Sequence, residues 1–178
     1  MLYIYRSQLL LMDNNDRGEA TYACPIENDV FPKHVNYYLA IMAVSCYKCE
    51  YLLILLYEQF ILSGGPLEWI LFGLDAVDPK IKRIALINEK LAYRPWTICQ
   101  DDLSSIIKEG EHCWKLSEVI KACFIMSTYH GLCGLCLGMG LQPDTDSLVM
   151  LTKVFGQKVE MLVSSKILKR ANVTVPDR

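Results

Sequence analysis

The sequence lacks a large excess of charge of either sign. It has 18 lysine and arginine residues against 20 aspartate and glutamate residues, for a formal net charge of −2. A nucleic-acid-binding domain normally carries a basic excess, so we expect no nucleic-acid partner. Charged residues make up only 21% of the chain and hydrophobic residues 52%. This composition is the opposite of that of a disordered chain, and it predicts a folded protein of one domain or slightly more.

A secretory signal is also missing. The first residues read MLYIYRSQLLLM, and Arg6 splits the apolar run that a signal peptide needs. Eight cysteines in a secreted chain would indicate a disulfide framework. Without the signal, we expect an intracellular protein whose cysteines are reduced.

The sequence contains none of the common catalytic or metal-binding motifs that we sought. It has no G-x-S-x-G turn, no phosphate-binding glycine loop and no H-E-x-x-H helix. The pairs Cys46/Cys49 and Cys133/Cys136 are two C-x-x-C motifs, but they lie too far apart for a zinc ribbon and in apolar helical contexts. We therefore expect neither metal nor cofactor. His112 and His130 are the candidate bases, and His130 is interpreted as a hydrogen-bonded core histidine.

Hydrophobic periodicity predicts helices, and no stretch alternates as a strand would. A long helix over His34–Leu62 is apolar nearly all round and ends at Gly64-Gly65-Pro66. The further helices are expected at Leu67–Gly73, Lys80–Ala92, Asp101–Glu109 and after Trp114. The fold class is therefore predicted to be all-α, a helical bundle.

The last of these helices contains a candidate membrane span. Ala122–Leu141 has 20 residues without a charged side chain and includes the helix-pairing pattern Gly134-x-x-x-Gly138. It is also rich in Cys, Ser, Thr and Gly and continues N-terminally as an amphipathic helix, with Leu116 and Ile120 on its apolar stripe. We favour a buried helix whose end is loosened by glycines, with a membrane span as the alternative.

Cys46 and Cys49 form the first candidate reactive site. On one helix the two sulfurs would lie one turn apart on the same face. A thiolate there can attack a peroxide or disulfide and its neighbour can resolve the product, and Lys48 would favour the anion. The alternative is that both thiols are small core hydrophobes. A redox role requires the sulfur of Cys49 to lie near solvent.

Several segments together resemble a known family. They are Tyr38–Ala43 (YLAIMA), Cys49–Leu52, Gly64-Gly65 followed by Trp69, Leu86–Trp96 (LINEKLAYRPW), Glu111–Trp114 (EHCW), Leu116–Glu118, Ala122, Tyr129-His130 and Gly138–Gly140. From about Pro32 to Asp144 the chain resembles the N-terminal domain of the sestrins, which are stress-inducible regulators of nutrient signalling. The resemblance implies an N-terminal segment with a polar loop (1–31), a sestrin-like helical domain (32–144) and a divergent helical tail or truncated linker (145–178).

The resemblance implies a fold similar to alkyl hydroperoxidase D and carries the peroxidatic thiol onto Cys49 and its companion tyrosine onto Tyr51. The family's relay histidine is replaced by Leu56. Leu52 stands where bacterial relatives have a second cysteine, and Tyr37 where they have a glutamate. We expect at most a weak cysteine-dependent peroxidase.

Cys46 is our candidate for a substitute resolving thiol; this assignment is not a feature of the family.

The implied function is that of a stress-response regulator. In the family this means restraining target-of-rapamycin complex signalling through the GATOR complex and limiting reactive oxygen species, in the cytoplasm and also the nucleus. The alternatives are a thiol-dependent alkyl hydroperoxide reductase using Cys49, or an inactive truncated form. Full sestrins continue into a C-terminal domain that carries most of the leucine pocket. We find no match to that domain after Asp144, so we expect no leucine binding.

Overall fold

The computed structural model describes residues 30–107 and 112–143, with residues 149, 152, 153, 155 and 156. The secondary structure of these residues is helical, without a strand, which confirms the all-α class. The elements are α2 (Lys33–Ser45), α3 (Glu50–Leu62), α4 (Leu67–Leu71), η1 (Gly73–Asp75), α5 (Pro79–Arg83), α6 (Ala85–Tyr93), η2 (Pro95–Thr97), α7 (Gln100–Ile107) and α8 (Leu116–Gly138). The polar loop predicted before residue 30 and most of the predicted tail lie outside the described residues.

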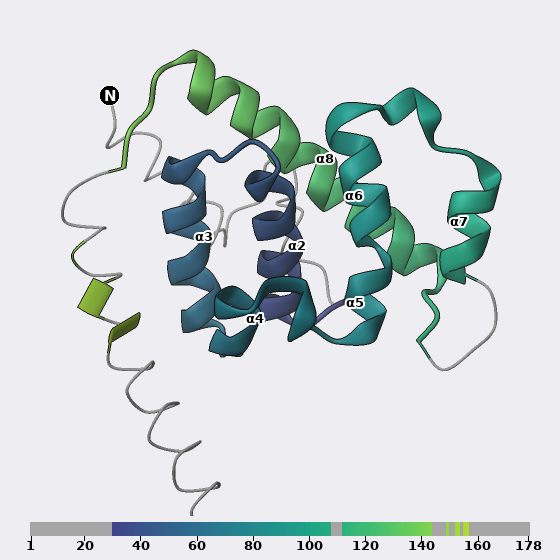
Figure 1. The fold of residues 1–178 in the computed structure, drawn as a ribbon, viewed down its shortest axis with the longest axis horizontal. Helices are drawn as coiled ribbons and strands as arrows, with labels where there is room; N and C mark the ends of the chain where they lie inside the picture. The colour runs from purple at the N-terminus through teal and green to yellow at the C-terminus, as the bar shows by residue number, and fades with distance from the viewer. Residues whose placement is uncertain (1–29, 108–111, 144–148, 150–151, 154, 157–178) are drawn as a thin grey trace, which may run out of the picture.

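Helix α2 is the centre of the bundle. It packs against α3, α6 and α8, and Figure 1 shows it between α3 and α6. Its residues Leu39, Ala40, Ala43 and Val44 are completely buried. A helix that is apolar on nearly every face is stable only when neighbours cover it, as the sequence indicated.

The predicted helix over residues 34–62 is wrong, because the structure divides it into α2 and α3. Helix α2 ends at Ser45, and Lys48 adopts a left-handed conformation with φ of 52°. An L-residue in that conformation cannot continue a right-handed helix, so the chain turns and α3 packs beside α2. Cys46 is the C-cap of α2 and Cys49 is the N-cap of α3. The two thiols therefore belong to a turn and not to one helical face.

The helix predicted over residues 80–92 is also divided. Helix α5 ends at Arg83, and α6 begins at Ala85. Asp78 caps α5, since its carboxylate accepts a hydrogen bond of 2.8 Å from the amide of Lys80. The sequence placed this region correctly but did not indicate the break.

The face that helix α8 turns to the core matches the predicted one only in part. Its buried residues are Val119, Lys121, Ala122, Ile125, Met126, Tyr129, Cys133 and Cys136. Leu116 and Ile120, predicted to be on the buried stripe, are 60% and 61% exposed. The predicted loosening by glycine is wrong at Gly131 and Gly134, which lie inside the helix.

Among the described residues, α8 is the one helix long and apolar enough to cross a membrane, and 44% of its most apolar window is buried. It packs along α2 and contacts α6 and α3. This packing favours the interpretation of α8 as a core helix.

The N-terminal end of α8 is anchored to α5. The indole of Trp114, which is 2% exposed, donates a hydrogen bond of 2.6 Å to the carbonyl of Lys80. The Lys80 ammonium lies 2.8 Å from the carboxylate of Glu118. Glu118 also accepts from the backbone amide of Lys115 at 2.8 Å, which satisfies one of the free amides at the helix start.

Candidate functional site

The turn between α2 and α3 holds the first candidate thiols. Cys49 is only 1% exposed, whereas Lys48 and Glu50 on either side are exposed. The sulfur of Cys49 therefore lies directly beneath a surface turn. The expectation that it lies near solvent is wrong for this conformation.

Two cysteines of α8, Cys133 and Cys136, are buried in the same core as Cys49. Cys133 is fully buried and Cys136 is 5% exposed. We call Cys49, Cys133 and Cys136 the thiol cluster. Both C-x-x-C motifs are visible in the sequence, but their distance along the chain gave no indication that the fold places Cys49, Cys133 and Cys136 in one core.

Burial controls the acidity of the two α8 thiols. Burial removes water from both thiols, and this desolvation is the main cause of their raised pKa values. Together with the electrostatic effect of Cys49, it raises the pKa of Cys133 to about 12 and that of Cys136 to about 11. Both thiols are therefore protonated at neutral pH. All three cysteines of the cluster are free, and no group of three or more His, Cys, Asp or Glu side chains in the described part of the chain is placed to hold a metal ion.

Cys46 contacts α6. Its Sγ is 3.4 Å from Nδ2 of Asn88 and 3.5 Å from the carbonyl oxygen of Met42. Asn88 Nδ2 also donates to that carbonyl at 3.0 Å, and Tyr93 donates to the Cys46 carbonyl at 2.6 Å. Burial raises the pKa of the Cys46 thiol, and the contact with Asn88 offsets only part of this effect. Cys46 is thus held by the α6 side of the bundle.

Cys46 borders a cavity of about 590 Å³. The cavity is lined by residues of α2, α3, α4 and α6 and by neighbouring turns, including Tyr38, Tyr57, Trp69, Asn88 and Glu89. Oδ1 of Asn88 is buried without a hydrogen-bond partner among the described residues. The thiol that borders this cavity is therefore Cys46, and not the predicted peroxidatic residue.

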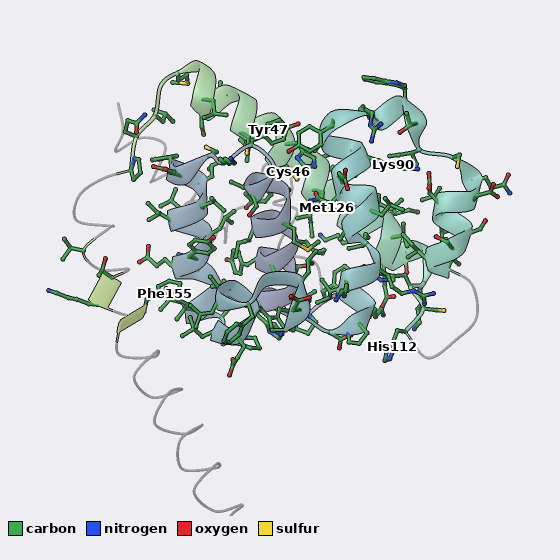
Figure 2. The ribbon with its side chains drawn as sticks, in the orientation of Figure 1. Cys46, Tyr47, Lys90, His112, Met126 and Phe155 are labelled. Atoms are coloured by element: carbon green, nitrogen blue, oxygen red, sulfur yellow. The ribbon has the colours of Figure 1, made fainter. Side chains whose placement is uncertain are left out.

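Tyr47 joins the turn to α8. Figure 2 shows Tyr47 beside Cys46 near the C-terminal end of α2. Its hydroxyl donates to the carbonyl of Ala92 at 2.7 Å, and its ring lies 5.4 Å from the imidazole of His130. Both nitrogens of His130 are inaccessible and lack a partner among the described residues. His130 is half-buried, so the predicted core position is confirmed only in part, and the predicted hydrogen bond is wrong. Burial lowers the pKa of this imidazole.

The other residues of the predicted site lie in α3. Tyr51 is in its first turn and 8% exposed, while Leu52 and Leu56 are 2% and 4% exposed. Leu56, at the position of the expected relay histidine, is thus a core residue that can carry no proton.

Comparisons with a family profile and with individual proteins give the same result. The sequence profile of the family described as "PA26 p53-induced protein (sestrin)" matches residues 25–173. The chain is 36% identical to Sestrin-2 of Homo sapiens over 112 residues, which are 63% of this chain and 23% of that protein. It is 37% identical to Sestrin-1 of Xenopus laevis over 112 residues, with the same two shares. It is 36% identical to Sestrin-3 of Mus musculus over 111 residues, or 62% of this chain and 22% of that protein.

The chain spans less than a quarter of the length of these relatives. The profile match, by contrast, extends over most of the chain and includes every described helix. The chain therefore belongs to the sestrin family.

Proposed function

We propose that this chain is a sestrin-like stress-response regulator that restrains target-of-rapamycin complex signalling by binding components of the GATOR complex, and that it limits reactive oxygen species. The observation that carries the proposal is the family match over residues 25–173. Because the match covers only 23% of human Sestrin-2, the whole activity of the relatives does not transfer automatically. The proposal assigns this chain the protein-binding part of that activity.

The exposed face of α8 offers a surface for such binding. Leu116, Ile120 and Phe124 recur every fourth residue and are 60%, 61% and 55% exposed. Side chains with this spacing lie on one face of a helix. An exposed apolar stripe is typical of a protein interaction site, and helical anchors at this spacing fit a groove or helix of a partner.

The test is co-precipitation of GATOR components by the purified 178-residue chain. We expect the unmodified chain to retain them and the double variant Ile120→Glu/Phe124→Glu to lose at least nine-tenths of the captured material. Leu62→Glu is the matched control, because Leu62 is a 72% exposed leucine on α3. All three proteins should show the same helical circular dichroism, since the changed side chains are mostly exposed.

Two results would contradict the proposal. One is a chain that is folded but captures no GATOR component, as an inactive truncated form would. The other is equal capture by the stripe variant and the unmodified chain, which would remove the binding role of α8.

A second candidate function is a thiol-dependent alkyl hydroperoxide reductase, and the observation that favours it is the thiol cluster around Cys49. Cys49 would attack the peroxide and become a sulfenic acid, and a second thiol would resolve it. Treatment with cumene hydroperoxide should then give a sulfenic-acid adduct on Cys49. Cys49→Ser should abolish peroxide consumption, and unchanged consumption would exclude the enzyme.

A further inference from the structure

The cavity beside Cys46 has the size of a small-molecule site. Its volume is about 590 Å³, and ligand pockets in proteins usually measure about 300–1,000 Å³. One wall is a single face of α2 and its C-cap, because residues three and four apart on a helix lie on the same side; these residues are Tyr38, Ile41, Met42, Ser45 and Cys46. Residues of α4, η1 and α6 complete the enclosure, together with Tyr57 of α3.

The wall formed by α2 and α4 is aromatic and held in place. The rings of Tyr38 and Trp69 lie 5.1 Å apart between centroids, at an interplanar angle of 73°. The hydroxyl of Tyr38 also donates to the carbonyl of Trp69 at 3.4 Å. Rings fixed in this way offer a preformed apolar surface, against which the hydrocarbon body of a ligand can pack.

Asn88 supplies the polar group of the cavity. It is 5% exposed, and its Nδ2 donates to the carbonyl of Met42 at 3.0 Å. This hydrogen bond fixes the orientation of the amide, so Oδ1 is the atom that remains, and it has no partner among the described residues. Buried amide oxygens are normally hydrogen-bonded, and an amide oxygen only accepts. A ligand that satisfies Oδ1 must therefore present an N–H or O–H group.

The charge of the cavity selects among such ligands. Among the described residues that line it, Glu89 alone carries a formal charge at neutral pH. Glu89 follows Asn88 in α6, is exposed, and forms no salt bridge with another described residue. A carboxylate without a neighbouring cation repels a carboxylate or phosphate ligand and attracts an ammonium group.

We propose that this cavity is a binding site for a small primary amine with an apolar or aromatic body. The ammonium group donates a hydrogen bond to Oδ1 of Asn88 and lies near the carboxylate of Glu89, while the body packs against Tyr38 and Trp69. The site goes beyond the proposed binding function, because it is built by α2, α4 and α6 and not by the exposed face of α8.

The experiment is a nuclear magnetic resonance titration of the isotope-labelled full chain with phenylbutylamine. The chain has three tryptophans, so three indole N–H signals report on separate places. Trp69 lines the cavity, whereas Trp96, which is 80% exposed, and the buried Trp114 do not. We expect a saturable shift of the Trp69 indole signal and of the Asn88 side-chain amide signals, with little change at the other two indoles.

Two ligands with the same body test the recognition of the amine. Phenylbutanol can still donate to Oδ1 but lacks the charge, and an exposed ion pair contributes little, so it should bind about threefold more weakly. Phenylbutyrate has no donor at neutral pH and carries a charge of the same sign as that of Glu89. It should bind more weakly than the amine by a factor of about ten or more.

Variants at exposed positions then test the charge without disturbing the core. Leu86 lines the cavity and is 51% exposed, and Leu86→Lys should weaken binding of the amine about fivefold more than binding of the alcohol. Leu62→Lys is the matched control, because Leu62 is a 72% exposed leucine of α3 outside the cavity, and it should leave both affinities unchanged. Glu89→Gln should lower the affinity for the amine to that for the alcohol.

Three results would overturn the inference. They are the absence of a saturable shift of the Trp69 signal with soluble phenylbutylamine, equal shifts of the Trp69 and Trp96 signals, or binding of phenylbutanol or phenylbutyrate as tight as that of the amine. Each of these can be observed whether or not the chain binds GATOR components, so the two proposals fail independently.

Discussion

Gly65, in the α3–α4 turn, should tolerate no side chain for want of space. A Cβ built on Gly65 would lie 2.4–2.5 Å from three carbon atoms of the Phe60 ring. Phe60 is completely buried, and its ring contacts the ring of Tyr38 at 5.9 Å and that of Trp69 at 6.2 Å. The ring therefore cannot move out to solvent to make room. Gly65→Ala must shift the ring or the turn by about 1 Å to restore the usual carbon–carbon separation of ~3.5 Å.

The magnitude follows from the density of the core. Adding a methyl group to a well-packed core costs about 1–3 kcal/mol in the free energy of unfolding. For a domain of this size, a loss of ~2 kcal/mol lowers Tm by about 4–10 °C. Gly134→Ala is the matched control, because its Cβ would meet nothing within 4 Å and the residue lies inside α8. Replacing glycine by alanine in a helix interior should stabilise the protein by about 0.5–1 kcal/mol.

The assay is urea unfolding of the three proteins, followed by helical circular dichroism. The reasoning requires opposite signs for two substitutions that are chemically identical. A Gly65→Ala protein as stable as the parent would refute the packing of Phe60 against the turn, and a Gly134→Ala protein that loses stability would refute the open surroundings of α8.

Three further predictions concern the polar contacts. Lys90 lies 2.6 Å from Asp102, and its hydrogen bond is the largest cause that lowers the pKa of Asp102 from about 3.8 to about 2. The stabilisation by this carboxylate is present above about pH 4 and is lost as the pH falls towards 2. Asp102→Asn should therefore remove that part of the pH dependence of Tm. The same dependence of Tm on acidic pH in both proteins would contradict this prediction. Trp114→Phe leaves the carbonyl of Lys80 without the indole donor and should lower the free energy of unfolding, measured in urea, by about 1–3 kcal/mol. A decrease below about 0.5 kcal/mol, the size expected of a neutral surface substitution, would argue against the hydrogen bond. Burial opposes ionisation of Glu118, but hydrogen bonds from Lys80 and from the backbone amide of Lys115 outweigh the effect of burial and hold the pKa of Glu118 below its ordinary range. The stability lost in Glu118→Gln should therefore shrink as the pH falls below that range. A loss of stability that does not depend on pH would exclude the charge effect.

The helical class was predictable because hydrophobic spacing reports directly on helical faces. The breaks were not, because they depend on backbone conformation and not on apolar spacing. Nothing in the composition of residues 45–49 requires Lys48 to adopt a positive φ, and only the packing of α3 beside α2 explains it. Leu116 and Ile120 show the same limit, since a helix that is apolar on several faces does not indicate which face the bundle covers.

The candidate site was predictable only in its parts. The sequence identified both C-x-x-C motifs and the replacement of the relay histidine by Leu56. It could not show that Cys49, Cys133 and Cys136 are buried in one core, because that arrangement depends on the packing of α8 against α2 and α3. The choice of Cys46 as resolving thiol followed from sequence proximity alone and stays a prediction. The structure adds that Sγ of Cys46 lies 3.4 Å from Nδ2 of Asn88.

The two candidate functions place different demands on the residues present. Leu56 supplies no proton relay, and the Cys49 sulfur is covered, so the residues present do not favour rapid peroxide turnover. Binding needs no such relay, because Ile120 and Phe124 lie on the exposed face of α8 whether or not Cys49 reacts. The Cys49→Ser variant should therefore keep its partner, and the stripe variant should lose its partner without any change in the oxidation of Cys49.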